Sequence, residues 1–185
     1  VVEALLPVTA PDEDGGEWTV DGVMTRVATK LREMQRDADV SGDAKTTTSN
    51  RSFAVVDADA ASATRRAGNE AFVAGNYEEA ETKYTASLEK DGSCAKTWAN
   101  RAAARLKLKK YADARDDARA SRTLDPRFLK AWYREGEAAL ELEQYEDSAL
   151  AFFEGLQIDG DNADCKRMFD EAIARGRAAA ARTQK

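Results

Sequence analysis

Small, aromatic and helix-breaking residues recur every 34 residues through the middle of the chain. The segments 61–94, 95–128 and 129–162 agree position by position when they are placed under one another. Position 8 is small, position 17 is tyrosine, positions 20 and 27 are small, position 31 is aspartate and position 32 is glycine or proline. In that order the residues are Gly68, Ala102 and Gly136; Tyr77, Tyr111 and Tyr145; Ala80, Ala114 and Ser148; Ser87, Ser121 and Gly155; Asp91, Asp125 and Asp159; and Gly92, Pro126 and Gly160. Such a period predicts a stack of helical repeats that share one core.

Each segment is expected to form two helices joined by a short turn, so the expected fold class is all-α. The first helices are expected at about 62–74, 96–108 and 130–142, and the second helices at about 78–90, 112–124 and 146–158. Within a pair, the small residues at positions 8 and 20 are expected to face each other. The tyrosines at position 17, with Tyr84 and Phe152 at position 24, are expected to fill the space between repeats. Burial of each ring stabilises the fold by roughly 1.5–3 kcal/mol.

A further helix follows the third repeat and is expected to cap the stack. Its apolar stripe over about 163–177 consists of Cys165, Met168, Phe169 and Ile173. Asp161 or Asn162 is expected to begin this helix, because both side chains are favoured at helix N-termini. Gly176 and the residues after it are expected to fray or extend into solvent. Residues 163–185 are therefore assigned as a capping helix and a tail.

Residues 1–60 form an acidic extension ahead of the repeats. Over about 19–36, apolar residues recur at three- and four-residue steps and predict one amphipathic helix; they are Val20, Val23, Val27, Leu31 and Met34. Two interpretations of this helix stay open: it packs on the repeats, or it binds a partner such as another subunit of a larger complex. Residues 37–62 are rich in Ser, Thr, Asp and Ala and are expected to be a linker. Because the chain begins at Val1, we expect a fragment or a processed form.

Charge and composition narrow the classes of function. The net charge of −6 arises in residues 1–60, which hold 12 acidic and 6 basic residues, whereas residues 61–185 hold 22 of each. This balance argues against non-specific nucleic-acid binding, which needs clustered Lys and Arg. No apolar run approaches the length of a membrane span. The chain has no histidine, and Cys94 and Cys165 stand alone, so we expect no catalytic site, metal or cofactor, and a reducing, cytoplasmic location.

The 34-residue pattern resembles the tetratricopeptide repeat. The marker positions of that family are matched by Trp98 and Trp132 at position 4, by the glycines at position 8, by the small residues at position 20 and by Pro126. Thr64 replaces the aromatic residue of position 4 in the first repeat, and Ala118 replaces the large residue of position 24 in the second. The resemblance covers about residues 61–180 and implies a right-handed superhelix of helix pairs.

The resemblance also implies which side chains face a ligand. In this family the first helices line a concave groove, into which positions 2, 5, 6 and 9 point. Five groove residues match the two-carboxylate clamp of chaperone-binding tetratricopeptide domains, and they are Arg65, Asn69, Asn100, Lys130 and Arg134. Arg65 and Asn69 are four residues apart, as are Lys130 and Arg134, so each pair lies on one helix face. Arg65 stands where many members have Lys, and keeps the positive charge.

The ligand that this resemblance implies is the C-terminal tail of the 90-kDa or 70-kDa cytosolic heat-shock chaperones, which ends in Glu-Glu-Val-Asp. Arg65, Asn69 and Asn100 would hold the terminal carboxylate, and Lys130 and Arg134 would hold the acidic groups upstream of it. Asparagine suits this task because its amide donates to a carboxylate and also accepts from a peptide backbone. Ala103 and Lys107, further along the same face of the second repeat, would flank the valine of the ligand.

Two other functions remain open at this stage. The repeats can be a structural scaffold of a larger assembly, with the groove holding an internal or unrelated segment. Alternatively, the chain can belong to an enzyme whose catalytic domain lies outside it, because clamp domains of this family are often fused to enzymes. Within the chain itself the expectation is a protein-binding adaptor.

Overall fold

The computed structural model of the chain describes residue 22 and residues 57–183. In residues 57–183 it contains seven helices and no strand, which confirms the expected all-α class. The helices are α2 (Ala58–Val73), α3 (Tyr77–Lys90), α4 (Ala95–Lys107), α5 (Tyr111–Leu124), α6 (Leu129–Glu141), α7 (Tyr145–Ile158) and α8 (Ala163–Thr183). The amphipathic helix predicted over 19–36 and the linker up to residue 56 lie outside the described residues, except that Gly22 is helical.

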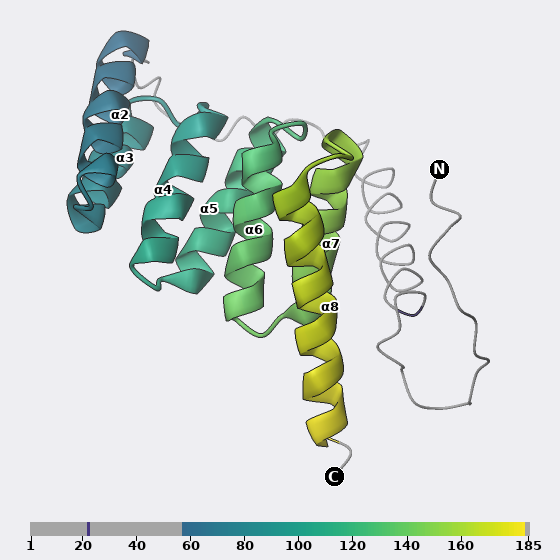
Figure 1. Cartoon of the computed structure of the whole chain (residues 1–185). Coiled ribbons are helices and arrows are strands. Elements are labelled where there is room, and N and C mark those ends of the chain that lie inside the picture. The colour runs from purple at the N-terminus through teal and green to yellow at the C-terminus, as the bar shows by residue number, and fades with distance from the viewer. Residues whose placement is uncertain (1–21, 23–56, 184–185) are drawn as a thin grey trace, which may run out of the picture.

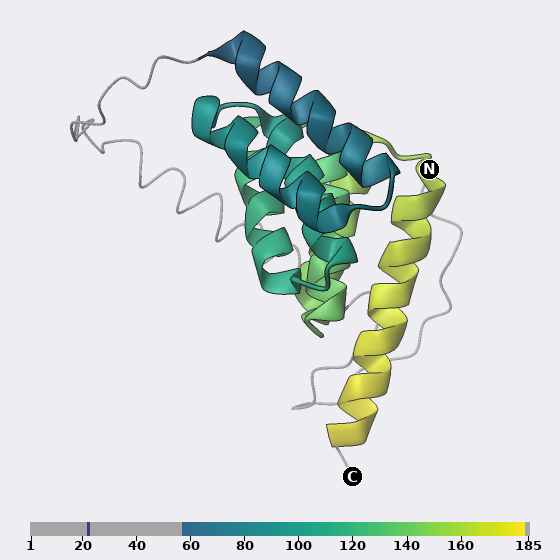
Figure 2. The ribbon, with the colours of Figure 1, turned by 90° about the vertical axis from the view of Figure 1, so that its left-hand side faces the viewer.

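The helices form three consecutive pairs, followed by α8 (Figure 1). Each helix packs on the next one along the chain, and the first helices of neighbouring pairs, α2 with α4 and α4 with α6, also contact one another. Figure 2 places α2 and α3 nearest the viewer, where they cross the pairs behind them at an angle. The first helices therefore share one layer, and side chains from three repeats meet on it.

Inside two of the pairs, a glycine at position 8 lies against an aromatic ring of the same repeat. A Cβ atom on Gly68 would lie 2.7 Å from the ring of Tyr84, and one on Gly136 would lie 2.7 Å from the ring of Phe152. Ser148 Oγ donates to the carbonyl of Gly136 at 2.9 Å, so positions 8 and 20 do face each other there. The two rings were expected between repeats; they fill the pair itself, within apolar clusters that extend to the next helix pair or α8.

Polar side chains close each repeat at defined positions. At position 27, Ser87 and Ser121 each donate to the carbonyl of position 1 in the same repeat, with O···O distances of 2.8 Å. At position 4, the indole nitrogens of Trp98 and Trp132 each donate at 2.8 Å to the carbonyl of position 32 just before their helix. These bonds explain why small hydroxyl residues and tryptophans recur with the period.

Both ends of the described region differ from the expectation. Helix α2 begins at Ala58, not near residue 62, because the Asp57 carboxylate accepts from the amide of Ala60 at 2.9 Å and caps it. At the other end, Asn162 Oδ1 accepts from the amide of Cys165 at 3.0 Å and caps α8. Asn162 is one of the two residues that were expected to begin this helix. Of the two alternatives for the residues after Gly176, fraying is wrong up to Thr183, because the alanine-rich sequence has high helix propensity and continues α8 with Arg177 and Arg182 exposed.

The turn inside each pair uses the same backbone conformation. Gly75, Lys109 and Glu143 occupy position 15 of their repeats, and their φ angles are 83°, 60° and 59°. Only the first of these is a glycine, the residue that adopts this region without steric cost. None of the helices in the described part of the chain is long and apolar enough to span a membrane.

Candidate functional site

A hollow of about 350 Å³ opens where α2, α4 and α6 meet; we call it the central hollow. Its polar lining includes four of the five residues that the sequence places in the groove, and these are Asn69, Asn100, Lys130 and Arg134. Phe72, Val73, Tyr84, Ala99 and Ala103 supply the rest of the wall. Residues from three repeats, more than 60 positions apart in the chain, are thus brought to one surface.

Two amides and a hydroxyl are joined at the floor of this hollow. Asn100 Nδ2 donates to Asn69 Oδ1 at 2.9 Å, and the Tyr84 hydroxyl donates to the same oxygen at 2.9 Å. An Asn oxygen that accepts both bonds leaves the Nδ2 group of Asn69 as the side that donates to a ligand. The hydrogen bonds therefore link the first and second repeats and orient one amide as a donor.

Tyr84 is buried in the core, and its hydroxyl hydrogen-bonds to Asn69 at the floor of the central hollow. Its side chain is 2% exposed, and burial raises the pKa of its phenol to about 12, against a smaller lowering by the positive charge of Arg65. The hydroxyl is therefore protonated at physiological pH and stays a donor to Asn69. A neutral donor of this kind orients the amide without adding a charge that would repel an anion.

Arg65, the fifth predicted residue, does not line the central hollow. Its Nη2 donates to Ser62 Oγ at 3.3 Å, within its own helix, and the guanidinium is half-buried. Against the larger effect of burial, its positive charge lowers the pKa of the Tyr84 phenol, but the guanidinium hydrogen-bonds to Ser62. Arg65 lies one helical turn before Asn69 on α2, outside the hollow that the other four residues line.

The two cations on α6 differ in their partners. Lys130 is exposed, and among the described residues its ammonium has no ion-pair partner. The Arg134 guanidinium lies over the ring of Tyr133, 5.6 Å from the ring centre, and forms an ion pair with the Glu137 carboxylate. Arg134 therefore already binds a carboxylate in this structure, although one from its own helix.

A second hollow of about 290 Å³ continues from the first towards α8. Ala103 lines both hollows and Lys107 lines the second, where the sequence analysis expects them to flank the ligand. Apolar walls come from Phe72, Leu106, Leu140 and Met168, and charged or polar groups from Tyr111, Arg134, Glu137 and Glu141. The pKa of Tyr111 is raised by burial and by the neighbouring Glu141 carboxylate, to which it hydrogen-bonds.

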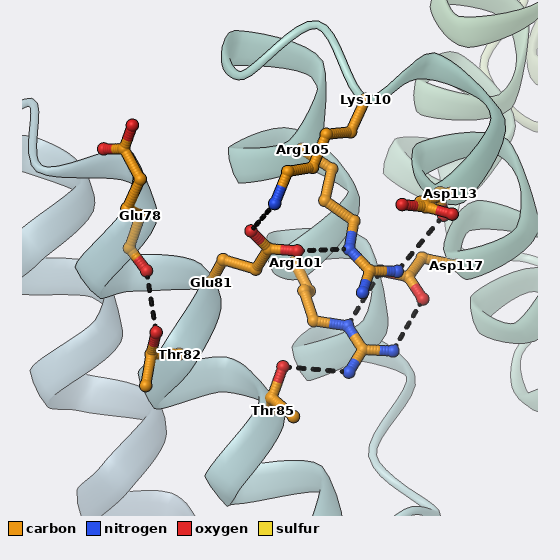
Figure 3. Close-up of polar contacts among 9 residues, drawn as sticks. All are labelled: Glu78, Glu81, Thr82, Thr85, Arg101, Arg105, Lys110, Asp113 and Asp117. Atoms are coloured by element: carbon orange, nitrogen blue, oxygen red, sulfur yellow. Dashed lines mark hydrogen bonds and ion pairs between the residues drawn. The ribbon is translucent and has the colours of Figure 1, made fainter.

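Away from the groove, a buried ion network holds α3, α4 and α5 together (Figure 3). Arg101 donates from Nε and Nη2 to the two oxygens of Asp117, at 2.9 and 2.8 Å, and Arg105 joins Asp117 at 2.9 Å. Arg105 and Lys110 both reach Glu81, at 2.9 and 2.7 Å. Burial would raise the pKa of Glu81, but these two cations outweigh it and lower that pKa.

A second buried charge, at the same position of the next repeat, joins α6 to the preceding helix α5. The carboxylate of Glu135, which is 5% exposed, binds Arg119 at 2.8 Å and Arg122 at 2.5 Å. The sequence alone predicts that an acidic pair such as Asp116-Asp117 lies at a helix start or on a solvated outer face. That assignment is wrong for Asp117, which is 3% exposed. The buried residues Arg101 and Glu135 both occupy position 7, directly after the groove residues Asn100 and Arg134.

No metal site accompanies the groove in the described part of the chain, where no three His, Cys, Asp or Glu side chains are grouped to bind an ion. Cys165 is buried, and burial together with the charges of Asp159 and Asp164 raises the pKa of its thiol. The chemistry that the site offers is therefore hydrogen bonding and ion pairing to an anionic ligand.

No protein-family model and no curated protein sequence matches the chain, but its fold is similar to those of several solved structures. The second tetratricopeptide domain of human RPAP3, in complex with the HSP70 peptide SGPTIEEVD, is 30% identical with a TM-score of 0.61. That match covers 62% of this chain and 96% of the other.

Two domains of the protein Spaghetti (RPAP3), each bound to the HSP90 peptide SRMEEVD, are also similar. The first tetratricopeptide domain is 28% identical, with a TM-score of 0.64 and coverage of 66% of this chain and 97% of that one. The second is 34% identical, with a TM-score of 0.53 and coverage of 54% and 93%.

Proposed function

Because the chain belongs to the tetratricopeptide-repeat family and carries a domain of the chaperone-binding type, we propose that it is an adaptor that binds the acidic C-terminal tail of a heat-shock chaperone. The partner would be a 90-kDa or 70-kDa chaperone with a tail ending in Glu-Glu-Val-Asp. Binding to such a chaperone would place the protein in the cytoplasm.

One observation carries this proposal: four side chains able to bind carboxylates line a single hollow. Asn69, Asn100, Lys130 and Arg134 come from three repeats, and a hydrogen bond of 2.9 Å joins the two amides. A C-terminal aspartate offers two carboxylates a few ångströms apart, one on the main chain and one on the side chain. Two amide donors and two cations around one hollow match that ligand in charge and in hydrogen-bonding capacity.

The roles of the residues follow from their positions. Asn69 and Asn100, with Arg65 beside them, would hold the terminal carboxylate, while Lys130 and Arg134 would hold the acidic groups upstream. Ala103 and Lys107 would border the valine, because Ala103 lies where the central hollow passes into the second and Lys107 lines the second. Each charge-assisted hydrogen bond contributes roughly 1.5–3 kcal/mol, and the ordering of a peptide offsets part of the sum. The expected affinity is modest and falls as salt rises.

The test compares the peptide SRMEEVD with its C-terminal amide by isothermal titration calorimetry. Amidation removes one of the two terminal carboxylates, so the amide should bind at least about tenfold more weakly, the effect of one charge-assisted contact. Lys130→Ala and Arg134→Ala should weaken the free acid by a similar factor. Lys166→Ala is the matched control, because it removes the same charge from an exposed residue of α8 that lines neither hollow.

Equal binding of the acid and the amide would contradict the clamp. It would favour the scaffold alternative, in which the groove holds a segment without regard to a free C-terminus.

A further inference from the structure

The ion pair between Arg134 and Glu137 stands inside the groove. Nη1 of Arg134 lies 2.5 Å from Oε2 of Glu137, three residues further along α6, and the two side chains are 31% and 27% exposed. Arg134 lines the central hollow, and both residues line the second one. Glu137 is therefore a carboxylate of the protein itself at a place where the proposed ligand brings its own.

A ligand carboxylate that pairs with Arg134 competes with Glu137 for a single positive charge. Before binding, the charges around the second hollow balance, with Lys107 and Arg134 opposite Glu137 and Glu141. After binding, the ligand carboxylate and Glu137 share the charge of Arg134, so one negative charge is no longer balanced. Glu141 is already engaged by Tyr111 and lies 3.9 Å from Arg175, so the carboxylate that loses its counter-charge is that of Glu137. A positive charge on the ligand would restore the balance.

The spacing of such a charge follows from geometry. Residues three apart on a helix place their Cβ atoms about 5–6 Å from each other. In an extended peptide, residues two apart point to the same side and lie about 7 Å apart. A ligand with the order base, any residue, acid can therefore give its acid to Arg134 and its base to Glu137 at the same time. The intramolecular ion pair is exchanged for two intermolecular ones.

We propose that Glu137 is a specificity-determining residue, which selects ligands with a basic side chain two residues before the acidic residue held by Arg134. The inference rests on the proposed function and deepens it. In SRMEEVD, Arg stands two residues before the first Glu; in SGPTIEEVD, Thr stands at that place. The groove should therefore prefer a tail of the first kind, in which the ligand supplies both members of the exchange.

The experiment measures three peptides that share the same last four residues: SRMEEVD, SQMEEVD and RSMEEVD. The second removes the positive charge, and the third moves it by one residue, which turns it to the opposite side of an extended chain and leaves no acid two residues after it. On the full chain, SRMEEVD should bind about threefold to fivefold more tightly than either of the others, the range of one partly exposed ion pair.

Glu137→Gln should remove this preference and should also tighten the binding of SQMEEVD, because the competing carboxylate is gone. A merely structural role of Glu137 would change all three affinities in the same direction. Glu89→Gln is the matched control: it removes the same charge from an exposed residue of α3 that lines neither hollow, and should leave the preference intact.

Two results would overturn the inference while leaving the proposed function in place: equal affinity of the unmodified chain for all three free acids, or an unchanged preference in the Glu137→Gln variant. If RSMEEVD binds as tightly as SRMEEVD, the attraction is long-range and Glu137 does not select. Failure of the proposed function would instead appear as equal binding of each peptide and its amide.

Discussion

Two neighbouring positions on the first helices, 6 and 7, use charged and polar residues in opposite ways. At position 6, Asn100 and Arg134 line the central hollow. At position 7, Arg101 and Glu135 are 9% and 5% exposed and are held by ion pairs to other helices. One step along the helix separates a side chain that lines the hollow from one that contacts only the rest of the protein. Residue type alone therefore says little about the role of a charged or polar side chain here, because that role depends on the helix face on which the residue lies.

The energetic consequences of the two faces should differ accordingly. A buried ion pair contributes little in net terms, but removing one partner leaves a charge without solvent or counter-ion. A groove residue can be removed at little cost to folding, because water replaces the missing contact. Variants at the two positions should therefore separate stability from binding.

The largest effect is expected for Asp117→Ala. It strands Arg101 and one contact of Arg105 in a site that is nearly closed to water. We expect the free energy of unfolding to fall by about 3–5 kcal/mol, measured by chemical denaturation. Asp116→Ala is the matched control, since its side chain is 68% exposed and its pairing with Arg115 spans 3.5 Å. That variant should change stability by less than about 0.5 kcal/mol; similar losses in the two variants would contradict the division between the faces.

Lys130→Ala should weaken peptide binding but leave the stability of the fold nearly unchanged. The loss of peptide affinity corresponds to roughly 1.5–3 kcal/mol, whereas the free energy of unfolding should change by less than about 0.5 kcal/mol, because Lys130 is exposed. The free energy of unfolding is measured by the same chemical denaturation as for the Asp117 variant. A destabilisation comparable with that of the Asp117 variant would mean that the groove face also supports the fold.

Tyr84→Phe tests the residue that joins the two faces, and its effect should be the smallest. Without the hydroxyl, Asn69 loses one of two donors, and peptide affinity should fall by about 1 kcal/mol, the net value of a typical hydrogen bond. Unchanged affinity would show that the amide needs no such support.

The same variant has a consequence for alkaline stability. Since the folded-state pKa of Tyr84 is raised to about 12 from 10.0, its stabilising effect is complete below pH 10 and is lost as the pH rises to about 12. The phenylalanine variant should lack this part of the alkaline loss, which denaturation curves between pH 9 and 12 would measure.

The period of 34 residues made most of the architecture predictable, because it fixes which residues share a helix face. The resemblance to the tetratricopeptide repeat then implied which positions face the groove, and Asn69, Asn100, Lys130 and Arg134 do line one hollow. Arg65 obeyed the same rule but lies beside the cavity, since its side chain turns back to Ser62. The position of a residue in the repeat predicts the helix face on which it lies, but not the rotamer of its side chain.

The buried network could not be predicted, because its partners come from different helices. Asp117 meets Arg101 across 16 residues, and nothing in the local pattern distinguishes it from the exposed Asp116. The pairing of Glu137 with Arg134 was missed for a different reason: it depends on which of several nearby charges the guanidinium selects. Helix ends shifted where a single side chain, such as Asp57, supplied a cap that the repeat period does not encode.

The tryptophans at position 4 also make the repeat array easy to observe. Trp98 is hydrogen-bonded just after the link between α3 and α4, and Trp132 just after the link between α5 and α6, so each indole marks one junction between repeats. Fluorescence from variants in which Trp18 and one of these two tryptophans are replaced by Phe would follow the opening of each junction separately. A stack of this kind can lose its terminal repeat while the remainder stays folded, and the two emission signals would reveal from which end this chain comes apart.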